Sequence, residues 1–184
     1  MTAAQKITQA MLFAAQRHTD QRRKGARGEP YVNHCAEVAA LIARHTDGDN
    51  TDAICAGLLH DTIEDTGTTY EELVSAFGEG VAGVVRECTD DKSLPKAERK
   101  RLQAERAPHK SPNAKMVKLG DKISNLRSIL DSPPPTWDLA RKQAYFAWAK
   151  RVIDGCRGVN AGLEREFDAL YAQGMERLDE ARSP

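Results

Sequence analysis

The stretch His60-Asp61-Thr62-Ile63-Glu64-Asp65 places one imidazole and three carboxylates within six residues. It follows the apolar run 53–59, which is typical of a buried helix. An unpaired buried charge costs several kcal/mol or more, so a cluster that follows this helix inward must be neutralised, most simply by a metal ion. On a continuous helix His60 and Glu64 would share one face, and Asp61 and Asp65 another. The stretch therefore predicts metal ligands beside free carboxylates; the alternative is a polar helix end that faces water.

Two residues far from this stretch are candidates for ligands of the same ion. His34 stands at the start of a predicted helix, and Asp121 lies in an apolar helix that gives it a reason to point inward. Together with His60 and Asp61 they offer two imidazoles and two carboxylates without a thiolate, a set that suits Mn²⁺, Fe²⁺ or Zn²⁺. Such a site, with open positions, polarises a phosphoryl oxygen and acidifies a bound water. Taken singly, His34 is explained as a helix-end residue and Asp121 as the surface partner of a nearby lysine.

Composition limits the class of protein. The chain has 184 residues, 40% hydrophobic and 29% charged, which predicts one globular domain over 1–184 with a peripheral tail from about residue 172. The 27 basic and 27 acidic residues give a net charge of +0, so we expect no nucleic-acid or membrane partner. No apolar stretch approaches the roughly 20 residues that span a bilayer.

Cysteine usage and the N-terminus bear on the compartment. The four cysteines are widely spaced and form no Cys-x-x-Cys pair, so we expect reduced thiols in an intracellular protein. The polar, mixed segment 1–11 shows no evident signal peptide. These observations predict a cytoplasmic location.

Apolar residues recur at helical spacing through the chain, and no convincing period-2 alternation appears. The pattern predicts an all-α domain of about eight to ten helices. Capping residues are expected at Asn33, at Asn50 or Thr51, in a box at Thr68–Glu71, and at Thr136, with Pro95 at a first helical position. The charged segment Glu176–Arg182 is expected to fray. The helices are expected at 3–18, from near Asn33, from Asn50 or Thr51 through the opening stretch, between the box at 68–71 and Phe77-Gly78, at 79–87 and about 95–107, from Ser111-Pro112, from Thr136 to about 155, and from Asn160.

At this point the sequence resembles a known family, the HD-domain metal-dependent phosphohydrolases. Within that family it is most similar to the hydrolase half of the RelA/SpoT homologues, and closest to the small stand-alone alarmone hydrolases. The resemblance runs from about Ala3 to about Leu170. The Glu-Asp-Thr that follows His-Asp is its most specific part, because it separates this branch from other HD nucleotidases. The stretches that carry it are Gln21-Arg22-Arg23-Lys24, Pro30-Tyr31-Val32-Asn33-His34, Leu58 to Thr66, Val117 to Lys122, and Asn125-Leu126-Arg127.

The resemblance implies a catalytic centre and a reaction. The implied ligands of one Mn²⁺ per chain are His34, His60, Asp61 and Asp121. Glu64 and Asp65 are implied to orient and activate the attacking water. The family's reaction removes the 3′-pyrophosphate of guanosine tetra- or pentaphosphate, gives GDP or GTP and pyrophosphate, and so ends the stringent-response signal.

The resemblance also implies a substrate site. Arg23 and Lys24 match the loop against the base, Asn125 and Tyr145 match residues near the ribose and phosphates, and Lys96 and Arg141 match cations for the phosphates. A planar guanidinium stacks well on a purine, and a pyrophosphate leaving group needs cations, so these residue types agree with the roles. Without the resemblance, segment 22–24 is an ordinary surface turn, segment 96–101 a solvated helix face, and Tyr145 a core aromatic.

The sequence departs from the family pattern at two places. Cys35-Ala36-Glu37 follows His34 where relatives often have a Pro and small apolar residues, and Gly120 precedes Asp121 where Ala is usual. Neither departure removes a ligand. The length leaves no room for the synthetase and regulatory domains of long relatives, so we expect a hydrolase only.

Two other functions remain open from the sequence. One is an HD phosphohydrolase that acts on another ribose phosphate, such as the 2′-phosphate of NADPH or a deoxynucleotide. The other is a non-catalytic helical binding module.

Overall fold

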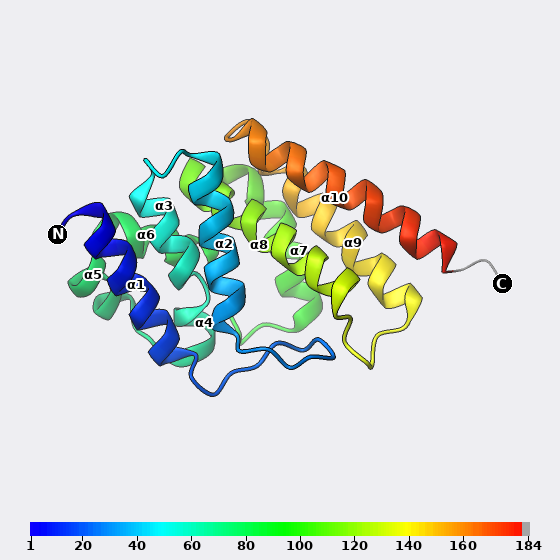
Figure 1. Cartoon of the computed structure of the whole chain (residues 1–184), viewed down its shortest axis with the longest axis horizontal. Helices are drawn as coiled ribbons and strands as arrows, with labels where there is room; N and C mark the ends of the chain where they lie inside the picture. Colours follow the sequence, from blue (N-terminus) through cyan, green and yellow to red (C-terminus); the bar gives the residue numbers. More distant parts are fainter. Residues whose placement is uncertain (182–184) are drawn as a thin grey trace.

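The computed structural model describes residues 1–181 as a bundle of α-helices, with no strand in that range (Figure 1). The predicted all-α fold is confirmed. The N-terminus and the end of the last helix lie at opposite ends of the bundle. The helices are α1 (Ala3–Arg17), α2 (Val32–His45), α3 (Thr51–Leu59), α4 (Thr62–Thr66), α5 (Tyr70–Phe77), α6 (Glu79–Cys88), α7 (Lys96–Arg106), the short 3₁₀ helix η1 (Ala107–His109), α8 (Pro112–Asp131), α9 (Leu139–Asp154) and α10 (Ala161–Glu180).

Helices α2, α3 and α8 form the centre of the core. α8 packs against α2, α3, α6, α9 and α10, and α3 is buried on all sides from Ala53 to Leu59. Two glycines allow the close approach of these helices. A Cβ on Gly120 would lie 3.1 Å from Cγ1 of Val38, and a Cβ on Gly57 would lie 3.0 Å from Cδ1 of Ile42. This packing holds the functional ends of α2 and α3 against the middle of α8.

The opening stretch is not one helix, contrary to the sequence expectation. α3 ends at Leu59, His60 and Asp61 form a turn, and the five-residue α4 follows. Asp61 has φ −102° and ψ 0°, outside helical geometry. His60 and Glu64 therefore do not share one helix face. The turn gives His60 and Asp61 a different direction from Glu64 and Asp65, which lie on α4.

Two predicted N-caps in the first half of the chain are misplaced by one or two residues. α2 begins at Val32, and Asn33 already lies inside it rather than capping it. The capping box of α5 uses Thr69 and Glu72 rather than the pair one residue earlier. Asn50 does cap α3, because its side chain accepts from the amide of Ala53 at 3.1 Å. Local hydrogen-bond partners decide these positions, and adjacent Ser, Thr or Asn residues compete for them.

Two predicted starts in the second half also differ. Pro95 stands just before α7 rather than at its first position. Thr136 does not cap α9, because the amide of Trp137 bonds to the carbonyl of Pro134 and takes Thr136 into a turn. Asp138 caps α9 instead, accepting from the amide of Arg141 at 2.8 Å.

The C-terminal segment is better packed than its charge suggested. α10 continues to Glu180, so the expected fraying of 176–180 is wrong; Arg182 lies outside the described residues. Leu178 is 6% exposed, and Gly174 packs closely on the ring of Phe146. Gly174 and Leu178 thus attach the end of α10 to the rest of the bundle.

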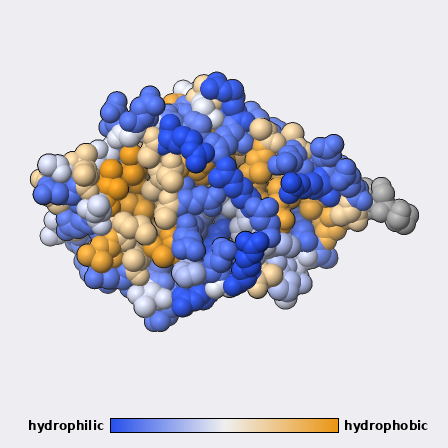
Figure 2. All heavy atoms as spheres, viewed as in Figure 1, coloured by the Kyte–Doolittle hydropathy of each residue, from blue (hydrophilic) through white to orange (hydrophobic). Residues whose placement is uncertain are grey.

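The surface is mostly polar. Hydrophilic residues cover the middle of the face seen in Figure 2, and hydrophobic residues gather on both sides of it. Leu12 on α1 is 59% exposed. None of the helices described in residues 1–181 combines the length and the hydrophobicity that a transmembrane span requires.

Candidate functional site

Three buried side chains from separate elements form the candidate metal centre. His34 comes from the first turn of α2, His60 from the turn after α3, and Asp121 from the middle of α8, and their ligand atoms all lie within 4.8 Å of one another. Oδ1 of Asp121 is 3.4 Å from Nε2 of His34 and 4.0 Å from Nε2 of His60. Within the described chain neither Nε2 has a hydrogen-bond partner, although both are buried. Orphaned buried nitrogens are rare, and a divalent cation between these groups would satisfy both, so the residues fit a metal.

The fourth predicted ligand, Asp61, lies beside both imidazoles. Its Oδ2 is 3.0 Å from Nε2 of His60 and 3.9 Å from Nε2 of His34. The same oxygen accepts a hydrogen bond from the hydroxyl of Tyr31 at 2.5 Å. The structure thus brings all four predicted ligands to one place, and Tyr31 is a contact that the sequence did not predict.

Both imidazoles are turned by a bond to Nδ1. The Nδ1 of His60 bonds to the carbonyl oxygen of Gly57 at 2.9 Å, and the Nδ1 of His34 bonds to Oγ of Ser124 at 2.8 Å. These partners leave Nε2 of each ring as the atom that faces the centre. Ser124 gave no signal in the sequence, because an isolated serine inside a helix is common.

The pKa shifts differ between the two imidazoles of the centre. Burial lowers the pKa of His34 and favours its neutral, ligating form. Burial alone would raise the pKa of Asp121, but the ammonium of Lys122 and the ring of His34 hold it well below its usual range. For His60 the neighbouring Asp61 outweighs burial and raises the pKa, so without a cation these carboxylates attract a proton to the cluster.

Lys122 is a buried partner of Asp121. Its Nζ donates to Oδ2 of Asp121 at 2.7 Å, and it lies 4.4 Å from the ring centroid of Trp148. The sequence allowed Asp121 a lysine partner only at the surface, yet both side chains are at most 10% exposed. Because Oδ2 is taken by the lysine, Oδ1 is the oxygen that faces the imidazoles.

The two candidate catalytic carboxylates project from α4. Oε2 of Glu64 accepts from the amide of Asp90 at 3.1 Å, and Oε1 lies 3.7 Å from Nη1 of Arg99. Burial, together with the charge of Asp61, raises the pKa of Glu64 despite that amide. Asp65 accepts from Nε2 of Gln21 at 2.9 Å and pairs with Lys92.

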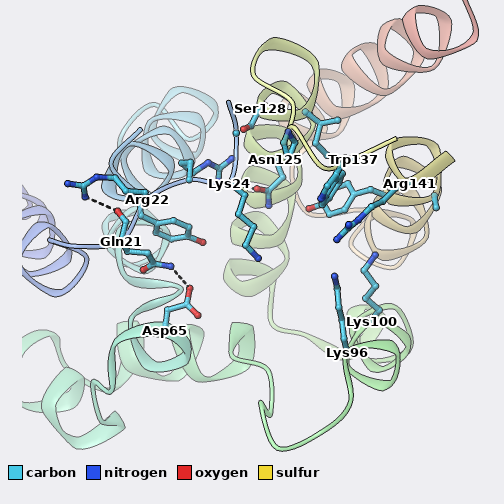
Figure 3. A pocket seen from close by; sticks show the side chains of 17 residues that line it. Gln21, Arg22, Lys24, Asp65, Lys96, Lys100, Asn125, Ser128, Trp137 and Arg141 are labelled. Atoms are coloured by element: carbon cyan, nitrogen blue, oxygen red, sulfur yellow. Dashed lines mark hydrogen bonds between the residues drawn. The ribbon is translucent and has the colours of Figure 1, made fainter. Parts of the chain in front are cut away.

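A pocket of about 360 Å³ opens beside these groups, between the turn at residues 21–25 and helices α7, α8 and α9 (Figure 3). Asp65 lines it, as does Tyr31, which bonds to Asp61. Figure 3 shows Lys24 reaching in from one wall and Lys96 and Arg141 from the opposite wall. All six residues predicted to bind substrate line the pocket: Arg23, Lys24, Lys96, Asn125, Arg141 and Tyr145.

Hydrogen bonds connect this pocket to the candidate metal centre. Nη1 of Arg23 donates to Oδ1 of Asn125 at 3.1 Å, and Nδ2 of Asn125 donates to Oδ1 of Asp121 at 2.5 Å. The guanidinium of Arg23 also lies 5.9 Å from the ring centroid of Tyr31. Two side chains, Arg23 and Asn125, therefore connect a ligand that contacts Arg23 to Asp121 of the candidate metal centre.

The far wall of the pocket is strongly cationic. Lys96, Lys100 and Arg141 line it, and burial together with the charges of neighbouring cations lowers the pKa of Lys100. The guanidinium of Arg141 lies 4.7 Å from the ring centroid of Trp137, which fixes one face of the cation. Concentrated positive charge of this kind suits a polyphosphate.

Sequence reasoning missed several lining residues. Lys100 follows Lys96 by one helical turn, and that spacing is a usable signal for a role in the pocket. Trp137 and Ser128 line the pocket without a signal of their own.

Comparisons with known proteins agree over most of the chain. The family model described as "HD domain" matches residues 10–150. A Danio rerio protein named guanosine-3′,5′-bis(diphosphate) 3′-pyrophosphohydrolase MESH1 is 47% identical over 172 residues, which cover 94% of this chain and 96% of that protein. The Homo sapiens protein of the same name is 46% identical over 170 residues, which cover 92% of this chain and 95% of that protein. A solved structure, described as a metazoan orthologue of SpoT that hydrolyses ppGpp and plays a role in starvation responses, matches with a TM-score of 0.87 at 43% identity and covers 91% of this chain and 94% of its own.

Proposed function

Because this chain belongs to the HD-domain family, we propose that it is a metal-dependent hydrolase that removes the 3′-pyrophosphate of guanosine tetra- or pentaphosphate. The products are GDP or GTP and pyrophosphate, and the reaction would end a stringent-response signal. One observation carries the proposal: the pocket that gathers the six candidate nucleotide-binding residues adjoins the buried His/Asp cluster. We assign the activity to a single hydrolase domain over residues 1–184.

The chain's own residues account for binding the cation. His34, His60, Asp61 and Asp121 would hold it, and we propose Mn²⁺ because the donors are imidazoles and carboxylates without a thiolate. When bound, such an ion polarises a phosphoryl oxygen and acidifies a water. Lys122 keeps Asp121 ionised and oriented for this task.

Glu64 and Asp65 act on the attacking water. The raised pKa of Glu64 brings its basicity closer to neutral pH, where a general base is most effective. The amide of Asp90 holds one of its oxygens, so the carboxylate is oriented rather than free to rotate. Asp65, held by Gln21 at the edge of the pocket, positions the water from the substrate side.

The pocket binds and orients the nucleotide. Arg23 offers its guanidinium plane to the base, with Lys24 beside it, while Asn125 and Tyr145 contact the ribose and phosphates. The cations of the far wall, Lys96 and Arg141, bind phosphate groups and stabilise the charge that develops on the leaving pyrophosphate.

A substrate comparison tests this function. Purified protein is assayed with guanosine tetraphosphate, guanosine pentaphosphate, NADPH and a deoxynucleoside triphosphate, each with Mn²⁺, with chelator, and with chelator followed by excess Mn²⁺. We expect the fastest turnover with the guanosine polyphosphates, equal amounts of GDP or GTP and pyrophosphate, loss of activity with chelator, and recovery with Mn²⁺.

Other outcomes would identify another function. Faster release of phosphate from NADPH or from the deoxynucleotide would reassign the substrate. A protein that binds these nucleotides but turns none of them over would be a binding module. Metal analysis of the protein as purified tests the assignment of Mn²⁺.

We also propose that the protein works in the cytoplasm. All four cysteines are buried thiols without a disulfide, which suits a reducing compartment. Imaging of the tagged protein tests this assignment.

A further inference from the structure

A hydrogen-bonded relay leads away from His34 on the side opposite the cluster. Nδ1 of His34 bonds to Oγ of Ser124 at 2.8 Å, and the Ser124 hydroxyl donates to Oε2 of Glu37 at 2.6 Å. A serine hydroxyl has one hydrogen to donate, and Ser124 donates it in a hydrogen bond to Glu37. Oγ of Ser124 must therefore accept the hydrogen bond from Nδ1–H of His34. The relay therefore fixes the His34 tautomer with a lone pair on Nε2, the atom that faces the cluster.

Glu37 is itself held in place. Its second oxygen, Oε1, accepts from Nη1 of Arg127 at 2.9 Å. Arg127 also pairs with Glu166 on α10, and Oε2 of Glu166 lies 2.5 Å from Nε2 of His45. Both oxygens of Glu37 thus have partners on α8, and one of these partners, Arg127, is itself held by Glu166 of α10.

The two imidazoles of the cluster have different supports. His60 is held by a neutral backbone carbonyl, that of Gly57, whereas His34 is held by a serine backed by a carboxylate. A carboxylate behind a ligating histidine orients the ring and makes it a stronger donor. Glu37 also stands in one of the two segments where this sequence departs from the pattern of the family it resembles.

We propose that Glu37, acting through Ser124, is a positioning residue for His34 and strengthens cation binding at the cluster. The inference rests on the proposed function, because it assumes that the cluster binds a divalent ion. It assigns to the chain's own side chains a contribution that the four ligands alone do not make.

The location of Glu37 separates this role from substrate binding. With His34 and Arg127 it lines a second cavity of about 160 Å³. Glu37 and Ser124 are both absent from the lining of the nucleotide pocket, as far as the described residues define it. Loss of either side chain should therefore change metal affinity and leave nucleotide affinity unchanged once the metal site is saturated.

A Mn²⁺ titration tests the proposal. Protein stripped with chelator and then freed of it is titrated with Mn²⁺, and free Mn²⁺ is followed by its electron paramagnetic resonance signal. We expect Glu37→Ala and Ser124→Ala each to raise the Kd for Mn²⁺ by about 10-fold or more. The Kd of the double variant for Mn²⁺ should be no higher than that of the single variant with the higher Kd, because both residues act through one imidazole. Glu37→Gln keeps an acceptor without the charge and should fall between Glu37→Ala and wild type.

Glu29→Gln is the matched control. Glu29 lines the same second cavity, and its side chain pairs with Arg27 rather than with the relay. It should leave the Kd for Mn²⁺ unchanged, which separates the relay from a general loss of negative charge. At saturating Mn²⁺ every one of these variants should show the wild-type KM for nucleotide, a pattern that general structural damage would not give.

The outcomes distinguish the two proposals. If the wild type binds Mn²⁺ and both Glu37→Ala and Ser124→Ala bind it equally well, the inference is wrong and the proposed function stands. If the wild type binds Mn²⁺ but does not hydrolyse the nucleotide, while the variants bind Mn²⁺ weakly, the inference stands and the proposed function is wrong. A wild type that binds no Mn²⁺ overturns both. If Glu37→Ala does not fold, the smaller change Ser124→Ala decides.

Discussion

Arg23 donates a hydrogen bond to the side-chain oxygen of Asn125 across 3.1 Å, although the two residues are 102 positions apart in the sequence. Asn125 in turn donates to Asp121, a candidate ligand on the same helix. The turn at residues 21–25, which is proposed to contact the base, is therefore connected to the candidate metal centre through the side-chain amide of Asn125. This connection makes the pocket and the cluster a single unit, and it gives the first prediction.

Arg23→Lys should raise the KM for guanosine tetraphosphate by about 10-fold, because lysine keeps the charge but loses the planar face and the fixed donor. Asn125→Ala should also raise KM. Expressed as free energies, the effect of the double variant on KM should be smaller than the sum of the two single effects, since the residues contact each other. Steady-state kinetics with saturating Mn²⁺ measures this. Arg22→Lys is the control, because Arg22 lines the pocket while its guanidinium binds the carbonyls of Thr19 and Gln21. Strict additivity of the two changes would argue against the coupling.

Asp121→Ala should abolish metal binding and activity together, and should also weaken the fold without metal. The change leaves the ammonium of Lys122 buried without its carboxylate, which costs about 3–5 kcal/mol for a broken buried pair. Urea denaturation in chelator measures the stability, and metal analysis measures the occupancy. Asp154→Ala removes the exposed partner of Lys150 on α9 and should cost no more than about 0.5 kcal/mol. Equal losses in the two variants would show that Lys122 does not depend on Asp121.

Glu64→Gln should retain the metal but slow hydrolysis by about 100-fold or more, because the amide cannot accept the water's proton. The pH profile carries a second test. Burial raises the pKa of Glu64, so this carboxylate takes up a proton at a higher pH than an exposed glutamate would. A base must be ionised, so kcat of the wild type should fall as pH decreases through that raised pKa. A Glu64→Gln enzyme that keeps the same acid limb would assign the limb to another group.

Gly174→Ala should destabilise the protein by about 1–3 kcal/mol, in the range for overpacking a core. A Cβ at this position of α10 would lie 2.2 Å from Cε1 of Phe146 and 3.3 Å from Cδ1 of Leu130. Gly83→Ala is the matched control, since its Cβ would meet no atom of the described residues within 4 Å and it lies inside α6. That control should be neutral or stabilising by up to about 1 kcal/mol, through helix propensity. Urea denaturation compares them, and an unaffected Gly174→Ala would show that the end of α10 contributes little to the core.

Local patterns predicted the helices well and their starts less well. Apolar residues at helical spacing predicted the run of helices because one face of each must be buried. Starts at Asn50, Ser111 and Asn160 agree with the structure, since each side chain accepts from an amide three residues on. The starts at Asn33 and Thr136 were wrong because neighbouring turns, which depend on tertiary context, use these residues differently.

The sequence by itself determined which chemical groups are available to the site. These are the two imidazoles and the carboxylates of the candidate metal centre, and the cations that line the pocket. Only the tertiary structure decided how these groups meet. It broke the helix at Asp61, buried Lys122 against Asp121, and placed Ser124 and Glu37 behind His34. The physical reason is that a helical pattern depends on neighbours within a turn, whereas these contacts depend on how three helices pack, and packing is specified by side-chain volumes spread over the whole chain.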